Sequence, residues 1–440
     1  MTGLAKLDQH VQVLHGARVA LEPLRSSHVS IEIASGRITG IQHEALLAAK
    51  RSTASYIDLS GFLVMPGLIN AHDHLEFSLF PRMANPPYPN YIEWGTDIHN
   101  TFPALIAKHR AVPKELRLWW GGIRNLLSGV TTVSHHNPLW AELQREDFPV
   151  RVIQNYGWGH SLALGGDLCA ARAVTPEEYP FIIHACEGTD KIARAELSGL
   201  DRLGLLNSYT VLVHGLAIDA AGVALIERKR ASLIVCPSSN SFLFEQVPDM
   251  SVLGNITNLA LGNDSPLTAQ GDLLDEVRFA IGACRISDHA AYRMVTEAPA
   301  SILRLRDAQG SLSINGVADF FAVRDTGQEA VERLPSLSMH NIELVMIAGR
   351  VQLASEAILD RISPSEKQGL EPLRIDGTVR WLRAPIEELL RKTECVLGKG
   401  EVRLGSRQIS SEPSIKQFCE SRDCEAPLAL MNGSGQWSNR

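Results

Sequence analysis

The segment VMPGLINAHDH, residues 64–74, is the stretch that decides the fold class. An apolar run that ends in polar and ionisable residues is typical of a buried parallel strand whose carboxyl end opens into a site. Positions two apart face the same side of an extended strand, so the imidazoles of His72 and His74 can point into one site. A strand of this kind predicts neighbouring parallel strands and helices that cover them.

The chain beyond residue 67 repeats this pattern of strand, loop and helix. A helix is predicted over residues 114–127, because Leu116, Trp119, Ile123 and Leu127 share one face and Ser128-Gly129 follows. Seven or eight such units favour a closed (β/α)₈ barrel of the TIM type over an open sheet. The expected apolar strands are VTTV (130–133), VRVIQNYGW (150–158), FIIHACEG (181–188), YTVLVHGLA (209–217), ASLIVCPSSN (231–240) and NLALGND (258–264).

One strand of this barrel is not placed by the pattern. Between Val133 and Phe181 only residues 150–158 read as a strand, where a complete barrel requires two. The fourth strand is therefore expected to be short, to be distorted, or to lie within residues 161–173.

The two ends of the repeating region have a different, strand-rich pattern. Short alternating segments fill residues 11–66 and return at 317–355, separated by Gly, Ser and Pro turn signals. We therefore expect residues 1–66 plus 312–360 to form a small composite β-sandwich domain from both ends of the chain, and residues 67–311 to form the α/β barrel. Residues 361–440 form an extension of unknown role, with one helix expected at 379–395.

The composition is that of an ordinary globular enzyme. The 440 residues are 45% hydrophobic and 21% charged, and 42 basic against 49 acidic side chains give a net charge of −7. Without a basic block, no nucleic acid or anionic membrane is expected as a partner. No apolar run is long enough for a signal peptide or a membrane span, and seven scattered cysteines do not form a disulfide framework. These features predict a cytoplasmic protein that acts on a small molecule.

Ionisable residues stand at the ends of four predicted strands. Besides His72 and His74 these are His184, His214 and Asp264. Alone, each has an ordinary explanation: a His-x-His occurs by chance, a strand-end Asp caps a helix, and His214 fits a core histidine. Together they put ionisable groups at one end of the barrel, where packing alone would favour Val, Leu or Ile. Three imidazoles and a carboxylate suit Zn²⁺ or Fe²⁺.

The order and spacing of these motifs resemble the amidohydrolase superfamily, in the branch of adenosine, cytosine and guanine deaminases and triazine hydrolases. The similar segments run from the first strand block to Ser265, and residues 317–355 resemble the composite β-domain of that family. They are VMPGLINAHDH, GVTTV, the HxxE of His184 to Glu187, VLVHG, the CPSSN of Cys236 to Asn240, and LGNDS.

The resemblance implies a role for each matching residue. The ligands of one divalent metal, Zn or Fe, would be His72, His74, His184 and Asp264, and Asp264 would belong to the catalytic set as well. Glu187 would be the general acid/base, and His214 would orient or deprotonate the water that the metal activates.

The function that follows is a metal-dependent hydrolase of C–N bonds other than peptide bonds. The leading hypothesis is an aminohydrolase, a deaminase of a nitrogen heterocycle. The alternatives are a cyclic-amide hydrolase, or removal of another leaving group at the same site, and a non-catalytic metal-binding scaffold. A two-metal site would need a carboxylated lysine from the fourth strand, but no lysine occurs between Lys114 and Lys191. The absence of Pro-Cys-x-x-Cys excludes the unrelated Cys-ligated zinc deaminases.

Five residues near the same strand ends are candidates to bind the substrate. Arg82 follows the first strand and could hold a carboxylate, a phosphate or a ring carbonyl, although a surface arginine is an equal explanation. One of His135 and His136 should face inward. Trp158 and His160 could stack on a flat ring, with core packing as the alternative. A homodimer is compatible with the family resemblance.

Overall fold

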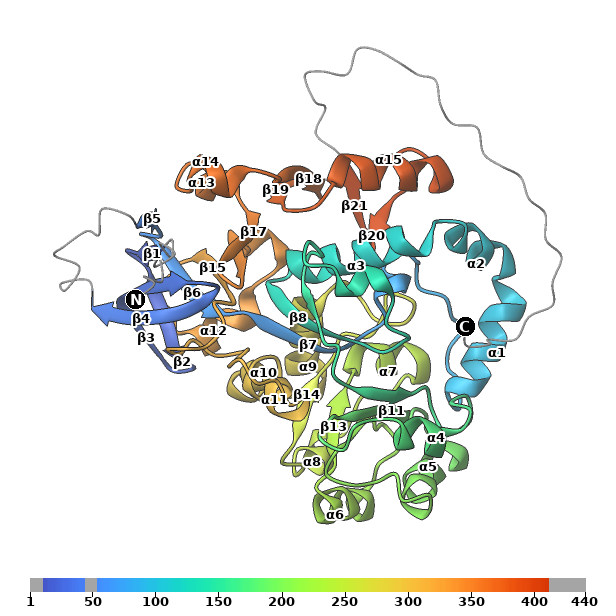
Figure 1. Cartoon of the computed structure of the whole chain (residues 1–440). Coiled ribbons are helices and arrows are strands. Elements are labelled where there is room, and N and C mark those ends of the chain that lie inside the picture. The colour runs from blue at the N-terminus through green and yellow to red at the C-terminus, as the bar shows by residue number, and fades with distance from the viewer. Residues whose placement is uncertain (1–10, 44–53, 411–440) are drawn as a thin grey trace, which may run out of the picture.

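The computed structural model describes residues 11–43 and 54–410, and Figure 1 shows parallel strands covered by helices at its centre. Eight central strands pair in parallel as two groups, β7-β8-β9 and β10-β11-β12-β13-β14. The expected α/β class is confirmed. The strands are β7 (Leu68–Asp73), β8 (Val130–His135), β9 (Arg151–Val152), β10 (Gly157–Gly159), β11 (Phe181–Ala185), β12 (Thr210–His214), β13 (Ser232–Val235) and β14 (Leu259–Leu261).

Helices follow most of these strands along the chain and bury apolar side chains against them. The predicted helix over 114–127 is α3, and all its residues from Arg117 to Leu127 are buried. Its position between β7 and β8 agrees with a parallel connection, which requires a crossover. The helices of this region are α1 (Tyr91–Thr101), α2 (Pro103–Arg110), α3 (Lys114–Leu127), α4 (Leu168–Ala173), α5 (Lys191–Arg202), α6 (Ala220–Lys229), α7 (Pro237–Phe244), α8 (Met250–Leu253), α9 (Leu273–Cys284), α10 (Asp288–Met294) and α11 (Glu297–Ile302).

The single strand expected over residues 150–158 is wrong. This segment forms two short strands: β9 pairs with β8, and β10 pairs with β11. The chain leaves the sheet between them at Gln154 and Asn155, whose side chains are exposed. At Gly157 a Cβ atom would lie 1.9 Å from the hydroxyl of Thr175, so only glycine fits there. The missing fourth strand is therefore β10.

The strand register brings the ionisable residues to one end of the parallel strands. In adjacent strands His184 of β11 stands opposite Val213, and the next pair is Ala185 with His214 of β12. The backbone N–H of Asp264, just after β14, donates to the carbonyl of His72 at 3.0 Å. The last strand of one group is thus joined to the first strand of the other at the level of the site.

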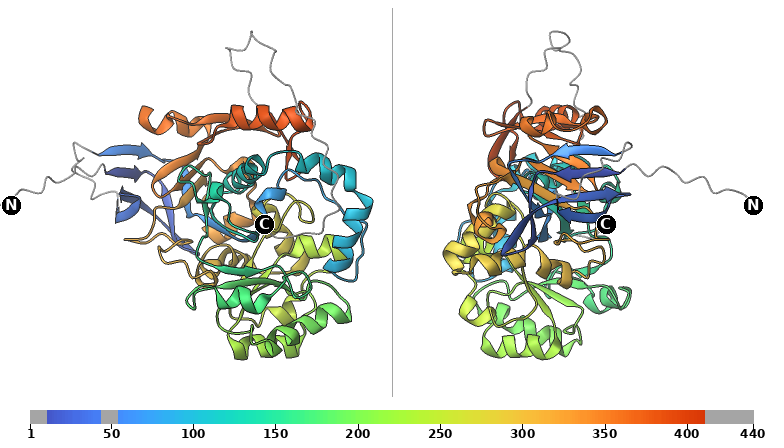
Figure 2. Two further views of the ribbon diagram at one scale, coloured as in Figure 1. Left: turned by 45° about the vertical axis from the view of Figure 1, so that its right-hand side comes forward. Right: turned by 90° about the vertical axis from the view of Figure 1, so that its left-hand side faces the viewer.

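A mixed, mainly antiparallel sheet contains strands from both ends of the chain. β6 pairs with β15 in antiparallel fashion and with β2 in parallel. Figure 2 shows these early and late strands side by side at one side of the molecule. The strands are β1 (Gln12–His15), β2 (Arg18–Glu22), β3 (Arg25–Ala34), β4 (Arg37–His43), β5 (Ser55–Asp58), β6 (Phe62–Pro66), β15 (Phe320–Arg324), β16 (Leu344–Ile347) and β17 (Arg350–Ala354).

Short helices complete this part of the chain. They are α12 (Ala330–Arg333), α13 (Glu356–Leu359) and α14 (Pro364–Lys367).

The segment after residue 361 continues that sheet to its end. β18 (Glu371–Ile375) pairs with β19 (Thr378–Leu382), and β19 pairs with β17. The helix expected at 379–395 begins later, as α15 (Ile386–Leu397), since the strand continues to Leu382 and Pro385 precedes the helix. Two short strands, β20 (Arg403–Leu404) and β21 (Arg407–Ser410), follow it, and β21 pairs with β18. Residues 411–440 lie outside the described part of the chain.

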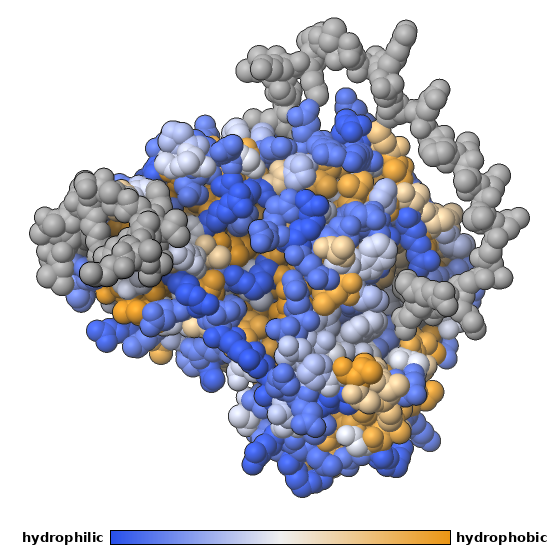
Figure 3. Space-filling view, viewed as in Figure 1, coloured by the Kyte–Doolittle hydropathy of each residue, from blue (hydrophilic) through white to orange (hydrophobic). Residues whose placement is uncertain are grey.

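The described surface is mostly polar, with one apolar region of note. Leu164, Val174, Ile192 and Leu203 are large apolar side chains that are 49–82% exposed. They lie next to or within α4 and α5, and Figure 3 shows apolar side chains gathered over these helices at the lower right. No helix in the described ranges is long and apolar enough to cross a membrane.

Candidate metal centre and active site

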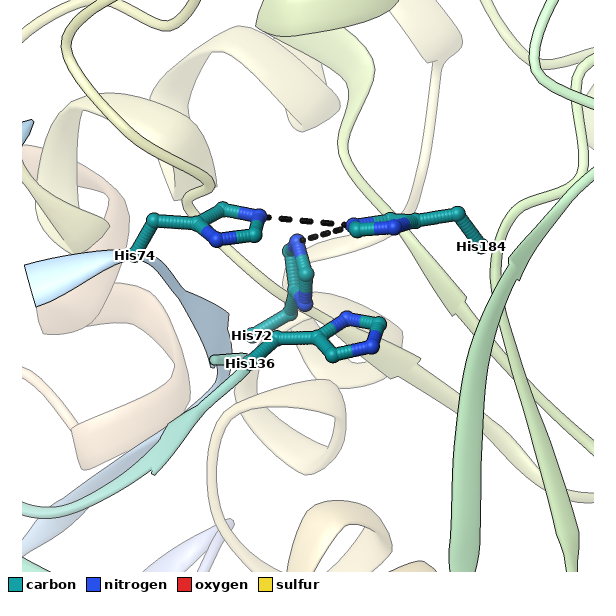
Figure 4. A group of neighbouring side chains, drawn as sticks. All are labelled: His72, His74, His136 and His184. Atoms are coloured by element: carbon teal, nitrogen blue, oxygen red, sulfur yellow. Dashed lines mark hydrogen bonds between the residues drawn. The ribbon is translucent and has the colours of Figure 1, made fainter. Parts of the chain in front are cut away.

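Three imidazoles from two strands meet at the carboxyl end of the parallel strands. The Nε2 atom of His184 lies 3.3 Å from that of His72 and 3.3 Å from that of His74 (Figure 4). All three side chains are buried, and the Nδ1 atom of His184 bonds the backbone carbonyl of His160 at 2.8 Å. That contact directs the other ring nitrogen of His184 toward the cluster.

A carboxylate from the loop just after β14 completes the group. The Oδ1 atom of Asp264 lies 3.7 Å from Nε2 of His72 and 3.8 Å from Nε2 of His74. Its Oδ2 atom accepts hydrogen bonds from Ser239 at 2.8 Å and Thr268 at 3.0 Å. The φ angle of Asp264 is +58°, a left-handed conformation that is uncommon outside glycine but better tolerated by aspartate. Two hydroxyls and the backbone turn thus fix the orientation of this carboxylate.

The donor set fits a divalent metal. Zn–N bonds of about 2.0–2.1 Å place tetrahedral ligand nitrogens roughly 3.3 Å apart, the separation seen here. Metal ligation requires neutral imidazoles. Burial, with the neighbouring imidazoles, lowers the pKa of His74 to about 3 and that of His184 well below its ordinary value. Both are neutral at pH 7 and offer lone pairs to a cation.

Glu187 and His214 face each other beside this cluster. The Oε2 atom of Glu187 lies 3.6 Å from Nε2 of His214, and both side chains are buried. Burial, together with the nearby carboxylates of Asp264 and Glu196, raises the pKa of Glu187 well above its usual range. Burial lowers the pKa of His214 to about 3. Without a bound cation, these shifts favour the protonated form of the carboxyl and the neutral form of the imidazole.

A fourth imidazole, that of His136, lies in the same cluster. Ligand atoms of His72, His74, His136 and His184 all lie within 4.8 Å of one another. The Nε2 atom of His136 bonds the carbonyl of Gly159 at 3.0 Å, so Nε2 carries the proton. Its buried Nδ1 atom has no hydrogen-bond partner among the described residues, and it points toward the other rings in Figure 4. His136 therefore presents a free acceptor to the site.

His135, the preceding residue, faces another group. Its Nδ1 atom accepts the backbone N–H of Leu75 at 3.3 Å, and its Nε2 atom lies 3.5 Å from Oε2 of Glu76. Glu76 also pairs with Lys114 at 3.3 Å. Glu76 was not predicted as a site residue; the one signal in the chain is its place two residues after His74.

The other three candidate substrate residues, His160, Trp158 and Arg82, differ in their distance from the imidazole cluster. The His160 ring is 4.9 Å from that of His184, and Trp158 lies edge-on to His136 with centroids 5.7 Å apart. Arg82 donates through Nε to the carbonyl of Ala269 at 3.3 Å, and its guanidinium lies 4.4 Å from the ring centroid of Phe242. Trp158 and His160 thus adjoin the imidazole cluster, whereas Arg82 is held by the loop after β14 and by α7.

The fold and this site define a metal-dependent hydrolase: buried neutral imidazoles and a carboxylate suited to a divalent metal, with a proton-bearing carboxyl beside them. Residues 176–351 match the amidohydrolase family. The proteins that this chain resembles include deaminases and a triazine hydrolase.

Individual proteins of known name are similar to this chain. The chain is 23% identical to the 5-methylthioadenosine/S-adenosylhomocysteine deaminase of Syntrophobacter fumaroxidans, over 71% of this chain and 84% of the relative. Its fold is similar to that of an adenosine deaminase from Xanthomonas campestris with bound zinc, with TM-score 0.61 and 19% identity over 78% of this chain and 93% of the other. It is also similar to atrazine chlorohydrolase from Arthrobacter aurescens complexed with zinc, with TM-score 0.66 and 15% identity over 88% and 99%.

Proposed function

We propose that this protein is an aminohydrolase that removes an amino group from a nitrogen heterocycle and releases ammonia. The observation that carries the proposal is the buried Glu187 carboxyl, which lies 3.6 Å from His214 beside the imidazole cluster and whose pKa is raised by burial. Departure of an amine requires a proton, and a carboxyl with a raised pKa can deliver one near neutral pH. Deaminase relatives support the same chemistry.

One divalent metal, Zn or Fe, would be held by His72, His74, His184 and Asp264. When bound, such a metal supplies Lewis acidity and lowers the pKa of a water ligand to about 7. A single metal is favoured because no lysine between Lys114 and Lys191 is available to bridge a pair.

The proton steps belong to the chain's own residues. Glu187 would give its proton to a ring nitrogen of the substrate, recover one from the attacking water, and pass it to the leaving amine. Neutral His214, 3.6 Å away, would orient that water and stabilise the developing charge. Asp264, held by two hydroxyls, would keep the water on the side of Glu187.

The heterocycle would lie against His136, Trp158 and His160. The free Nδ1 of His136 is an acceptor and so would recognise an N–H of the substrate. Trp158 and His160 offer ring faces at the same rim. Of the adjacent histidines only His136 is proposed to touch substrate, since His135 is turned to Glu76. Arg82 would contact a polar group at the outer end of the ring.

The proposal is tested by measuring metal content and ammonia release with purines, pyrimidines, pterins and triazines. We expect about one metal per chain and release of ammonia from one ring class. Glu187→Gln should keep the metal and lose about 10²- to 10⁴-fold in kcat, the usual contribution of a general acid/base. Glu146→Gln, a change at an exposed carboxylate, is the matched control. A protein that takes up neither zinc nor iron would contradict the mechanism.

The second candidate is the same site acting on another leaving group or on a cyclic amide. The similarity to an atrazine chlorohydrolase favours keeping this alternative. Hydrolysis of a ring substrate without ammonia, with release of chloride or opening of the ring, would identify it. A scaffold role is set aside, because Glu187 and His214 are buried as a pair that no scaffold needs.

We also propose that the two parallel groups are halves of one (β/α)₈ barrel over residues 67–311. The hydrogen bond from Asp264 N–H to the His72 carbonyl supports closure between β14 and β7. Residues 1–66 and 312–360 would form the composite β-sandwich domain, supported by the pairing of β6 with β15. The segment from 361 to 440 would be an extension of that domain, as β19 pairs with β17.

The oligomeric state is proposed to be a homodimer, with the apolar surface over α4 and α5 as the contact. Val174 is 82% exposed, so Val174→Lys would oppose burial of this surface. Sedimentation should give a dimer for the natural chain and a monomer for this variant; a monomer for both would contradict the proposal.

A further inference from the structure

The turn that carries Glu187 is fixed by backbone contacts on both sides. The carbonyl of Glu187 accepts the N–H of Tyr91 at 3.2 Å, and Gly188 forms a bridge with Asn90 at the start of α1. A Cβ atom at Gly188 would lie 2.6 Å from the carbonyl oxygen of Pro89, which requires glycine at this close approach. The first residues of α1 are therefore packed directly on the turn.

Glu196 of α5 holds the residue before Glu187. Its Oε2 atom accepts the backbone N–H of Cys186 at 2.7 Å. Cys186 is buried and has a φ angle of +57°, a left-handed conformation that a residue with a side chain adopts only when its surroundings impose it. The buried carboxylate of Glu196, 4% exposed, is one of two contacts that hold this backbone; the Cys186 carbonyl also accepts the N–H of Ala217 at 3.0 Å.

Tyr91 connects this carboxylate to α1. The Tyr91 hydroxyl donates to Oε1 of Glu196 at 2.7 Å and accepts the N–H of Ala163 at 3.4 Å. The Tyr91 side chain is 3% exposed. One hydroxyl thus joins three loops at the carboxyl end of the strands: the start of α1, the loop after β10, and the turn after β11.

We propose that Tyr91 and Glu196 are positioning residues that hold the Glu187 carboxyl in place beside His214. This inference rests on the proposed function, in which Glu187 moves the proton. The hydrogen bonds of Tyr91 and Glu196 go to each other, to Ala163 and to the turn, and none goes to an imidazole of the cluster. Both residues therefore act through the backbone of Cys186 and Glu187. Catalysis is sensitive to such placement, since a misplacement of about 1 Å can reduce a rate about 100-fold.

The test compares Tyr91→Phe, Glu196→Gln and the double variant with the natural chain. Phe keeps the ring but loses the hydroxyl, and Gln keeps the length but replaces one acceptor oxygen with a donor. We expect kcat to fall about 10- to 100-fold in each variant, with KM within about twofold and metal content unchanged. The double variant should be no slower than the slower single variant, because the two residues form one unit.

The control is Tyr88→Phe. Tyr88 lies three residues before Tyr91, and its hydroxyl bonds Asp97 and Asn85, away from the Glu187 turn. This variant should keep kcat, which separates loss of a loop hydroxyl from loss of this particular contact. A purely structural role would lower the unfolding temperature of Tyr91→Phe and leave kcat unchanged at lower temperature, which would overturn the inference.

Amide hydrogen exchange measures the stability of the Glu187 turn without requiring enzymatic activity. Peptides that contain Cys186 and Glu187 should exchange faster in Tyr91→Phe and Glu196→Gln than in Tyr88→Phe or the natural chain. If the natural chain releases no product from any ring, the proposed function fails, and exchange alone decides the inference. Unchanged exchange in both variants would overturn it.

Discussion

The two faces of strand β7 differ in how completely their polar groups are bonded. On one face the imidazoles of His72 and His74 meet His184, and their Nδ1 atoms have no partner among the described residues. On the other, Asp73 pairs with Arg124 at 2.6 Å and accepts from Asn125 at 2.7 Å. Both faces are buried.

We therefore expect the imidazole face of β7 to serve metal binding and the Asp73 face to hold the strand in place. On the first face the Nε2 atoms converge at a separation that suits one cation, so a metal bound there would supply the contact that their lone pairs lack. The bonded face attaches the strand to α3, whose Arg124 also donates to the carbonyl of Asp264 at 3.1 Å. Residues one position apart in the chain are therefore expected to respond to mutation in different ways.

The largest expected effect is that of His72→Ala on metal binding. Loss of one imidazole should weaken binding of zinc by more than the roughly 100-fold typical of a residue that only orients a ligand. Activity should fall with metal content. The unfolding free energy of the metal-free protein should change little or increase, because crowded imidazoles are relieved. Equilibrium dialysis and chemical denaturation check the two parts, and full retention of zinc would remove His72 from the ligand set.

Asp73→Asn should show the opposite pattern. The change leaves the buried guanidinium of Arg124 without its carboxylate, which costs about 3–5 kcal/mol of unfolding free energy. Zinc should still bind, since His72 and His74 are unchanged. Urea denaturation of the metal-free protein measures the loss. Equal unfolding free energies of the variant and the natural chain would contradict a stabilising role for the pair of Asp73 and Arg124.

A smaller effect is expected on the pH dependence of the unfolding free energy, through Glu276. This residue of α9 bonds Ser238 of α7. Its carboxyl bonds the backbone N–H and the hydroxyl of Ser238, and burial raises its pKa to about 8. The folded pKa exceeds the ordinary value of 4.5, so the native chain binds the proton more tightly and loses stability as the pH rises from about 4.5 to 8. The slope is at most about 1.4 kcal/mol per pH unit.

Glu276→Gln should remove this slope. The difference in unfolding free energy between the variant and the natural chain is therefore expected to shift in favour of the variant from pH 5 to pH 8. Parallel denaturation curves at four pH values measure it. A constant difference over this range would show that Glu276 is ionised in the native protein throughout.

The strand-end residues could be predicted because each follows an apolar run in the chain. His184, His214 and Asp264 need only the rule that parallel strands end at the same edge. Alternation could not choose between His135 and His136, because the register of β7 with β8 shifts near Asp73. That irregularity depends on packing between strands and leaves no mark in either segment alone.

The supporting residues could not be predicted for a related reason. Glu196 lies mid-helix, where a glutamate is ordinary, and its role follows from contacts with Tyr91, which is 105 residues away. The fourth strand was hidden because β10 has only three residues, two of them glycines that allow close approach of Leu168 in α4 and of Thr175. Short strands and long-range contacts carry little local periodicity.

The smallest expected effect is a loss of unfolding free energy when a hydrogen bond between α3 and α15 is removed. Trp120, on the helix that carries Arg124, donates its indole N–H to the hydroxyl of Thr393 in α15 at 2.8 Å. Both side chains are fully buried, so Thr393→Val leaves the indole N–H without an acceptor at a cost of about 1–3 kcal/mol. Thr393→Ser keeps the acceptor and should lose less. Metal content and kcat should be unchanged in both, because this contact joins α3 to α15 and includes no residue of the imidazole cluster. A fall in kcat at full metal occupancy would contradict this prediction and show that the contact with α15 influences the catalytic residues.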